Sequence, residues 1–236
     1  MVRFSRSHSS IVERANKTIQ PFMAQVYGWM TCGLLLTAFV AWYAARTPIL
    51  LQFIFSNHLV FFSLMIVQLV VVFILSNMVN RLSSMLATSF FMLYSALTGL
   101  TLASIFILYA SSSIASTFVI TSGMFGVMTV YGYTTKQDLT SFNNLLLMTL
   151  IGVGLASLVN LWLKSTMLTW LVTYTGVLLF VGLTAYDTQK LKKINTQLSL
   201  GNREQFHKES IFGALTLYLD FINLFLMFLR IFGNRR

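Results

Sequence analysis

The chain has 236 residues, of which 56% are hydrophobic and only 9% are charged, and its formal net charge is +10. Soluble domains carry about 25% charged residues, so this chain has too few to cover the surface of a soluble globule. Its long unbroken apolar runs are typical of membrane-spanning helices and exclude an outer-membrane barrel, whose strands alternate with period two. The single cysteine, Cys32, excludes a disulfide within the chain and a cysteine-based metal site.

Seven apolar runs are long enough to cross a bilayer, which takes about 20 mostly apolar residues. We predict spans at 23–45, 58–80, 86–109, 114–133, 143–163, 167–188 and 210–232. The connections between them are short, except for the polar stretch Thr188–Glu209. The sequence therefore predicts an all-α integral membrane protein, with a basic cytoplasmic tail at 1–22 and a single seven-helix membrane domain at 23–236.

Small residues recur at four-residue spacing within two of these spans. The rows are Ser95, Gly99 and Ala103, and Gly152, Ala156 and Asn160. Because such rows let helix backbones approach closely, we interpret them as packing surfaces rather than as ligand sites.

The orientation of the chain follows from its basic residues, which are enriched in cytoplasmic loops. With the N-terminus inside, eleven Lys and Arg residues fall on the inner side, and only Arg46 and Lys164 fall in outer loops. We therefore predict a cytoplasmic N-terminus, and we interpret the positive charge as topology signals and lipid contacts rather than a nucleic-acid surface. The side of the C-terminus stays open, because the last segment could span or re-enter, and its position decides where Arg230, Arg235 and Arg236 lie.

Two aspartates lie in or at the end of predicted membrane spans, where burying an ionised carboxylate costs free energy. Asp187 ends the apolar run 168–186, and Asp220 lies within the run 211–232. Two carboxyl groups close together in a medium of low dielectric constant share a proton and titrate in two separate steps. We predict a pH-responsive latch, in which the protonated pair holds two helices together and the deprotonated pair repels or recruits a cation.

Arg81 is the arginine available to this pair, since the second and sixth spans both end at the inner face. Asp220 lies about ten residues into its span, so a rise of about 1.5 Å per residue could place it about 15 Å deep. Contact with Asp187 then requires a shallower Asp220 or a shift of the sixth helix. The plainer alternatives are an interfacial Asp187, an Asp220 satisfied by the amide of Asn223, and an Arg81 that only marks the inner side.

Four stretches of the sequence resemble the Bax inhibitor (transmembrane Bax inhibitor motif) family. They are YSALTGLTL at 94–102, MFGVMTVYGYTT at 124–135, FVGLTAYDTQK at 180–190 and GALTLYLDFINLF at 213–225. The resemblance extends from about Ala24 to the end of the chain and is nearest to uncharacterised bacterial inner-membrane members.

The resemblance implies a bundle of seven helices, with two three-helix layers around a central C-terminal seventh helix. It also implies a pH-sensitive latch formed by Asp187 and Asp220, and an Arg81 that competes for Asp187. Family members are described as pH-dependent calcium leak channels, and eukaryotic relatives suppress cell death. The polar extension Leu191–Lys208 departs from the family pattern, and its function stays open.

The leading functional interpretation is a pH-sensitive, calcium-permeable leak channel or cation/proton exchanger in a bacterial inner membrane. In it, Asp187 and Asp220 would also supply oxygen ligands to calcium, and we predict no cofactor. The alternative is a non-transporting protein that modulates a membrane protease or another membrane complex through the basic stretch Lys190–Lys208. An intramembrane aspartyl protease also needs two aspartates, but Asp220 follows Tyr-Leu instead of a Gly-x-Gly turn, so we do not predict an enzyme.

Overall fold

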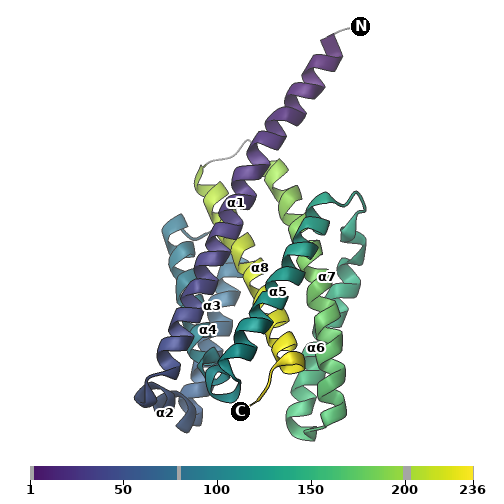
Figure 1. Ribbon diagram of the computed structural model, residues 1–236. Coiled ribbons are helices and arrows are strands. Elements are labelled where there is room, and N and C mark those ends of the chain that lie inside the picture. The colour runs from purple at the N-terminus through teal and green to yellow at the C-terminus, as the bar shows by residue number, and fades with distance from the viewer. Residues whose placement is uncertain (1–2, 79–80, 199–202, 236) are drawn as a thin grey trace. The chain divides into compact units, whose positions relative to one another are not determined.

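A computed structural model describes residues 3–78, 81–198 and 203–235 (Figure 1). Within those ranges the chain forms eight α-helices and one short 3-10 helix, η1. Their bounds are α1 Arg3–Ala45, α2 Pro48–Ser56, α3 His58–Met78, α4 Ser84–Leu108, α5 Ser111–Thr134, η1 Leu139–Phe142, α6 Asn143–Leu163, α7 Thr166–Leu198 and α8 Arg203–Phe232.

Seven of the helices are long and apolar enough to cross a membrane, and each coincides with one predicted span. The prediction of an all-α membrane protein is therefore confirmed. The sequence does not predict α2, a nine-residue helix that begins with Pro48 at its first position. Proline suits that position because its missing N–H would have no partner inside the helix. The sixth and seventh predicted spans correspond to α7 and α8.

Both helices extend into the polar stretch Thr188–Glu209, which the sequence presents as a connection. Helix α7 continues to Leu198 and α8 begins at Arg203, so most of this stretch is helical. The segment from Thr188 to Leu198 contains neither Gly nor Pro, and Lys, Gln and Leu are good helix formers. The backbone of 3–20, within the predicted basic tail, is likewise part of α1.

The chain divides into two compact units. Unit 1 comprises Met1–Ser104 and Leu191–Leu215, and unit 2 comprises Ile105–Lys190 and Thr216–Arg236. The predicted arrangement of two three-helix layers around the last helix stays a prediction.

Unit 1 is held by a close approach of α1 and α4. A Cβ on Gly99 would lie 2.7 Å from the carbonyl oxygen of Thr37, so only glycine fits there. The Thr37 hydroxyl donates a hydrogen bond of 2.8 Å to the carbonyl of Ser95. The row that contains Gly99 is thus a packing surface, as predicted. Gly152 in the second row has no neighbour within 4 Å of an added Cβ, so the packing prediction is wrong for that glycine.

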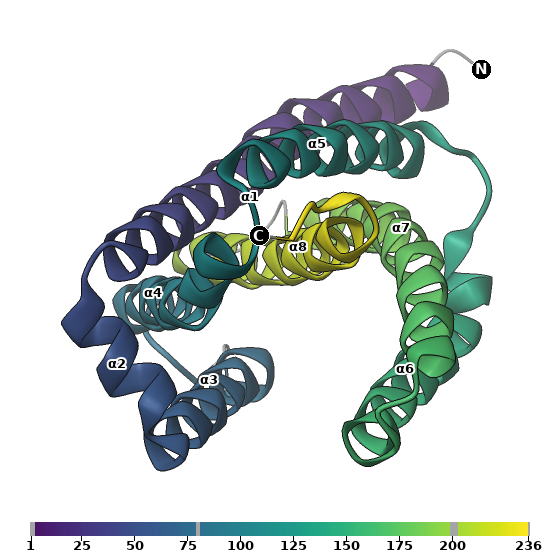
Figure 2. The same cartoon turned by 60° about the horizontal axis from the view of Figure 1, so that its bottom comes forward.

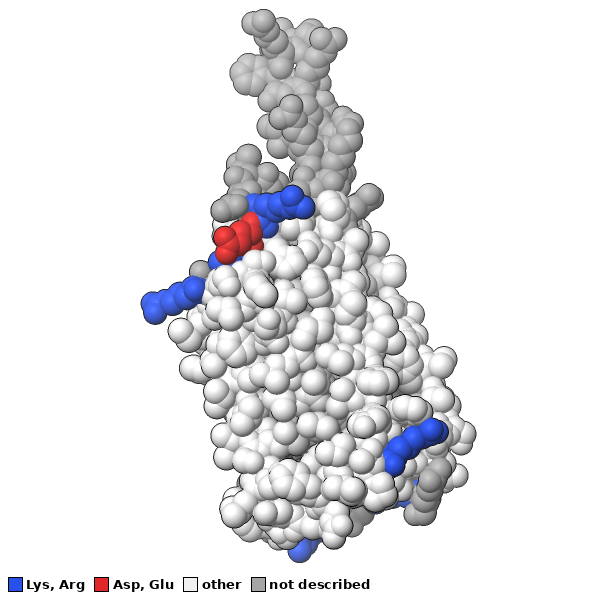
Figure 3. Space-filling view, turned by 90° about the vertical axis from the view of Figure 1, so that its left-hand side faces the viewer, with Lys and Arg blue, Asp and Glu red and all other residues white. Residues whose placement is uncertain are grey.

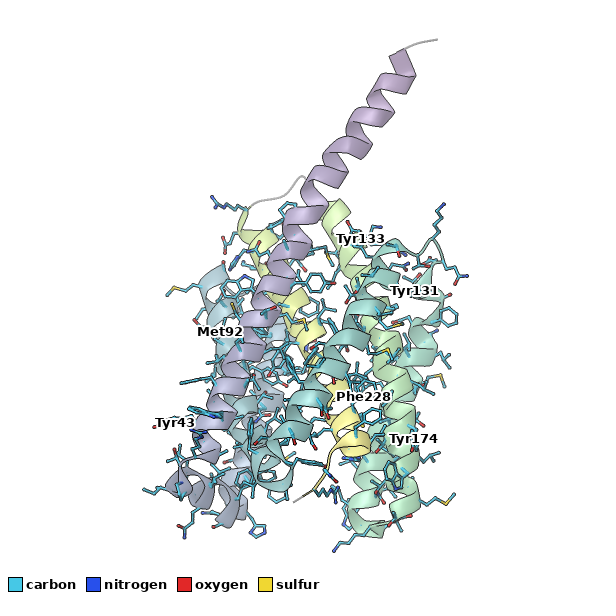
Figure 4. All side chains as sticks on the ribbon, viewed as in Figure 1. Tyr43, Met92, Tyr131, Tyr133, Tyr174 and Phe228 are labelled. Carbon is cyan, nitrogen blue, oxygen red and sulfur yellow. The ribbon has the colours of Figure 1, made fainter. Side chains whose placement is uncertain are left out.

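Unit 2 contains α5, η1, α6 and parts of α7 and α8, and α6 lies beside α7 in both views (Figures 1 and 2). Its core is formed by Leu179 and Phe180 of α7 with Leu224 and Phe228 of α8. We call the end where α5 meets η1 the Asp138 end, and the end where α6 meets α7 the Lys164 end. In Figure 4, Tyr131 and Tyr133 lie toward the Asp138 end, and Tyr174 and Phe228 lie nearer the Lys164 end.

The outer surfaces are apolar, as lipid contact requires. Helix α6 has no buried residue, and most of its large apolar side chains are exposed. On the face drawn in Figure 3, the coloured charged residues lie near the two ends, and the described residues of the band between them are uncharged. This distribution matches a hydrocarbon layer between two polar boundaries.

Candidate functional site

The structure brings Asp187 of α7 and Asp220 of α8 together within unit 2. Their carboxyl groups lie within interaction distance, where each acts on the other by charge and by hydrogen bonding. The two residues are only 8% and 5% exposed, so both carboxyl groups are buried within the protein. The structure therefore contains the contact between Asp187 and Asp220. The sequence could not establish this contact, because the predicted depth of Asp220 in the membrane left it open.

The pair results from an antiparallel register of α7 and α8. Nearer the Lys164 end, Arg230 donates a hydrogen bond of 3.2 Å to the hydroxyl of Thr173. One turn farther along, a Cβ on Gly176 would lie 3.1 Å from Met227. The contacting residues thus have rising numbers on α7 and falling numbers on α8, as in antiparallel helices. The same register continues to Asp187 on α7 and Asp220 on α8. Because α7 runs about 16 Å beyond Asp187, as eleven further residues at 1.5 Å rise imply, the pair lies within both helices rather than at a helix end.

The residues on either side of Asp187 hold α7 firmly against its neighbours. A Cβ on Gly132 of α5 would lie 2.3 Å from the backbone oxygen of Ala185, so the two helix backbones are in direct contact. The hydroxyl of Tyr186 donates a hydrogen bond of 2.8 Å to Asn143 at the start of α6. Asp187 is thus carried by a segment of α7 that contacts α5 and α6 at fixed points.

Gln189 connects the same segment of α7 to the loop before η1. Its side-chain oxygen accepts a hydrogen bond of 2.9 Å from the N–H of Leu139, and its amide donates one of 2.7 Å to the carbonyl of Gln137. Gln189 is buried, so these bonds are not exchanged freely with water. They tie the surface loop of the Asp138 end to the helix that carries Asp187.

Asp220 is held in place by aromatic packing of α8 against α5. The ring of Phe221 makes edge-to-face contacts with Phe118 and Phe125, at centroid distances of 5.4 and 5.5 Å. Asn223 donates one amide N–H to the carbonyl of Leu219 at 2.8 Å, and its role as a partner of Asp220 stays a prediction.

One oxygen of the pair has no partner. Oδ2 of Asp220 is buried without a hydrogen bond among the described residues. An ionised carboxylate only accepts hydrogen bonds, so a bond between two carboxyl groups requires that one of them carries a proton. The arrangement can therefore hold a proton, and losing it would leave two negative charges in a buried place.

Calcium would need more ligands than this pair provides. The described residues contain no group of three or more His, Cys, Asp or Glu that could hold a metal ion. Calcium usually takes six to eight oxygen ligands, so two carboxylates could offer a transient contact and not a storage site.

A cation of unit 2 acts on the pair, and the sequence did not predict it for this role. Lys190 follows Asp187 by three positions on α7, and its charge acts on that carboxyl group. Its ammonium group also lies 6.0 Å from the ring centroid of Tyr186. The signal was present in the spacing, because residues three apart are neighbours on a helix surface.

Arg81 belongs to unit 1, where it is exposed in the turn after α3, and its N–H donates to the carbonyl of Met78 at 2.9 Å. Its pairing with Asp187 stays a prediction.

Comparison with known proteins identifies the family. The profile of the family described as "Inhibitor of apoptosis-promoting Bax1" matches residues 19–236. The chain belongs to this Bax inhibitor family. The inner membrane protein YbhL of Escherichia coli strain K12 is 62% identical over 236 residues, which cover all of both chains. An uncharacterized protein of Borreliella burgdorferi is 45% identical over 91% of this chain and 92% of its own length. An uncharacterized protein of Deinococcus radiodurans is 41% identical over all of both chains.

Three of the stretches that carry the Bax inhibitor resemblance meet around the aspartate pair. The α5 stretch 124–135 contributes Phe125 and Gly132, which contact Phe221 and Ala185. The α7 stretch 180–190 carries Asp187, and the α8 stretch 213–225 carries Asp220. In this member of the family, the motif residues therefore build one site and its supporting contacts.

Proposed function

We propose that the protein is a pH-sensitive, calcium-permeable leak channel or cation/proton exchanger, gated by Asp187 and Asp220. The observation that carries the proposal is the buried hydrogen bond between the two carboxyl groups on neighbouring helices. Intramembrane carboxylates in contact are expensive to maintain and usually mark an ion or proton pathway.

In the proposed mechanism, the proton between the carboxyl groups determines the state of the gate. With the proton in place, the hydrogen bond holds α7 against α8 and the pathway is closed. When the proton leaves, two carboxylates repel each other, and Lys190 or Arg81 is available to stabilise a separated Asp187. The carboxylate oxygens, including the Oδ2 of Asp220 that has no partner among the described residues, then offer hard ligands to a passing calcium ion.

We further propose a multi-pass location in a bacterial inner membrane with a cytoplasmic N-terminus. The support is the similarity to the E. coli inner membrane protein and the bias of basic residues toward one side. The Asp138 end of unit 2, which includes Lys136, would then face the cytoplasm. Helix α8 is continuous to Phe232, and the N–H of Ala110 donates to the carbonyl of Asn234 at 3.1 Å, so 233–235 would lie at the outer side.

Calcium flux into liposomes tests this proposal. Purified wild type should admit calcium with a rate that rises with pH, and the double variant Asp187→Asn, Asp220→Asn should lose that pH response. Asp138→Asn is a matched control, since Asp138 is an exposed aspartate of the same unit whose side chain caps η1 by accepting the N–H of Thr140. No flux from folded wild type at any pH would refute transport.

A non-transporting regulator is the second proposal, and the basic stretch around Lys192 and Lys193 favours it as a contact for another membrane protein. In that case the aspartate pair would stabilise the fold only, and the liposomes would show no flux. We propose no enzymatic activity, because Asp220 lies within the uninterrupted helix α8 and not at a turn that would present it to a substrate peptide.

A further inference from the structure

The Lys164 end of unit 2 contains a cavity of about 640 Å³ that is lined by three basic residues. Lys164 comes from the turn after α6, Arg230 from the last turns of α8, and Arg235 from the segment that follows. Thr166 and Trp170 of α7 line the same cavity. In the sequence, Lys164 precedes Arg230 by 66 positions and Arg235 by 71, and the fold brings the three residues together.

Each of the three basic residues is anchored by a separate contact. Lys164 caps α6 in a left-handed conformation, with φ 48° and its N–H donated to the carbonyl of Asn160 at 2.8 Å. The guanidinium of Arg230 donates to Thr173, and that of Arg235 lies 5.9 Å from the ring centroid of Tyr109. The guanidinium groups of Arg230 and Arg235 are therefore held beside the cavity by Thr173 of α7 and by Tyr109, and the turn after α6 positions the backbone of Lys164.

No acidic residue of unit 2 balances these charges. The acidic side chains of the unit are those of Asp138, Asp187 and Asp220. Asp138 and Asp187 belong to its opposite end, where Gln189 bonds the loop before η1. Asp220 precedes Arg230 by ten residues on α8, which is about 15 Å along a helix. The cavity thus concentrates positive charge, which favours an anionic occupant.

We propose that this cavity binds the phosphate of an anionic phospholipid headgroup. Arginine and lysine recognise phosphate oxygens by charge-assisted hydrogen bonds. Leu161, which lines the cavity and is 69% exposed, gives the acyl chains an apolar surface. Trp170, which is 40% exposed, is of the type enriched where headgroups meet hydrocarbon. A free phosphate ion shares the recognition chemistry but would make no use of the apolar rim.

Thermal unfolding of the full-length protein in detergent tests the site without reference to transport. The probes are dioctanoyl phosphatidylglycerol, dioctanoyl phosphatidylcholine and inorganic phosphate, and each titration gives an apparent dissociation constant. We expect stabilisation by phosphatidylglycerol only. Arg230→Gln and Arg235→Gln should each raise its dissociation constant about tenfold, because one charge-assisted hydrogen bond contributes about 1.5 kcal/mol.

Arg46→Gln is the matched control, since it removes one exposed cation of a different connection, where Arg46 lies 4.3 Å over the ring of Trp42. It should change the dissociation constant less than about twofold, because Arg46 does not line the cavity. Equal stabilisation by the two lipids, or an equal effect of Arg46→Gln, would overturn the site. Stabilisation by inorganic phosphate at the same concentration would overturn the choice of lipid over the free anion. Arg235→Gln lies outside the helices, so it keeps the test valid if Arg230→Gln fails to fold.

Discussion

Single replacement of either aspartate by asparagine should remove the pH response of calcium flux almost as completely as the double replacement. An asparagine amide can donate to the remaining carboxylate without any proton, so the hydrogen bond between α7 and α8 persists at every pH. The gate of Asp187→Asn or Asp220→Asn should therefore stay closed where wild type opens. Because the two residues share one hydrogen bond, their effects should be strongly non-additive.

The expected size follows from the charges that the pair would carry. Two negative charges about 4 Å apart repel by about 4 kcal/mol at an effective dielectric constant of about 20. If only one third of this repulsion favours the open state, the ratio of open to closed protein changes about tenfold, since 1.4 kcal/mol is one factor of ten. Wild-type flux should therefore rise about tenfold from mildly acidic to mildly alkaline pH, whereas each single variant should change less than about twofold.

The assay is the fluorescence of a calcium dye trapped in liposomes, with the same amount of folded protein in each preparation. Asp138→Asn should retain the full pH response. Two single variants that each keep half of the response, with a double variant that loses the sum, would refute the coupling. A full pH response in both single variants would remove the pair from the gate altogether.

Three further predictions concern packing, the cation and topology. Gly132→Ala should lower the free energy of unfolding by about 1–3 kcal/mol through overpacking, whereas Gly152→Ala, with open space around it, should not lower it; equal thermal unfolding of the two would contradict the contact. Arg81→Ala should shift the pH midpoint of flux, and an unchanged midpoint would exclude Arg81 from the mechanism. Cysteines placed at Lys136 and Lys164 should react with an impermeant reagent from the cytoplasmic and the outer side respectively, and labelling of position 164 from the cytoplasm alone would reject the orientation.

The spans could be predicted from the sequence because hydropathy reports directly on the length of chain that a bilayer accommodates. The same signal misses α2, which is too short to span. It also ends the sixth span at Thr188, because Lys190, Lys192 and Lys193 lower the local hydropathy. Charged residues mark where a helix leaves the hydrocarbon layer, but they do not terminate the helix itself. Helix α7 therefore continues to Leu198.

The partners of Asp187 could be predicted only in part. Asp220 could be predicted as the partner of Asp187 because the chain contains so few carboxylates. Whether the two residues lie at the same level depends on how α7 packs on α8. Lys190 follows from helical spacing alone. The contact of Gly132 with α7 and the convergence of Lys164 with Arg230 are tertiary, and no local pattern encodes which helices become neighbours.

The bonds of Gln189 give the buried site a mechanical connection to the water outside. Any displacement of α7 near Asp187 must either break the two hydrogen bonds of Gln189 or carry the loop at 137–139 with it. Moving the loop keeps both hydrogen bonds, so we expect the loop to move together with α7 when the gate changes state. Lys136, adjacent to that loop and exposed, is thus a position from which an attached fluorophore could report events inside the membrane in real time.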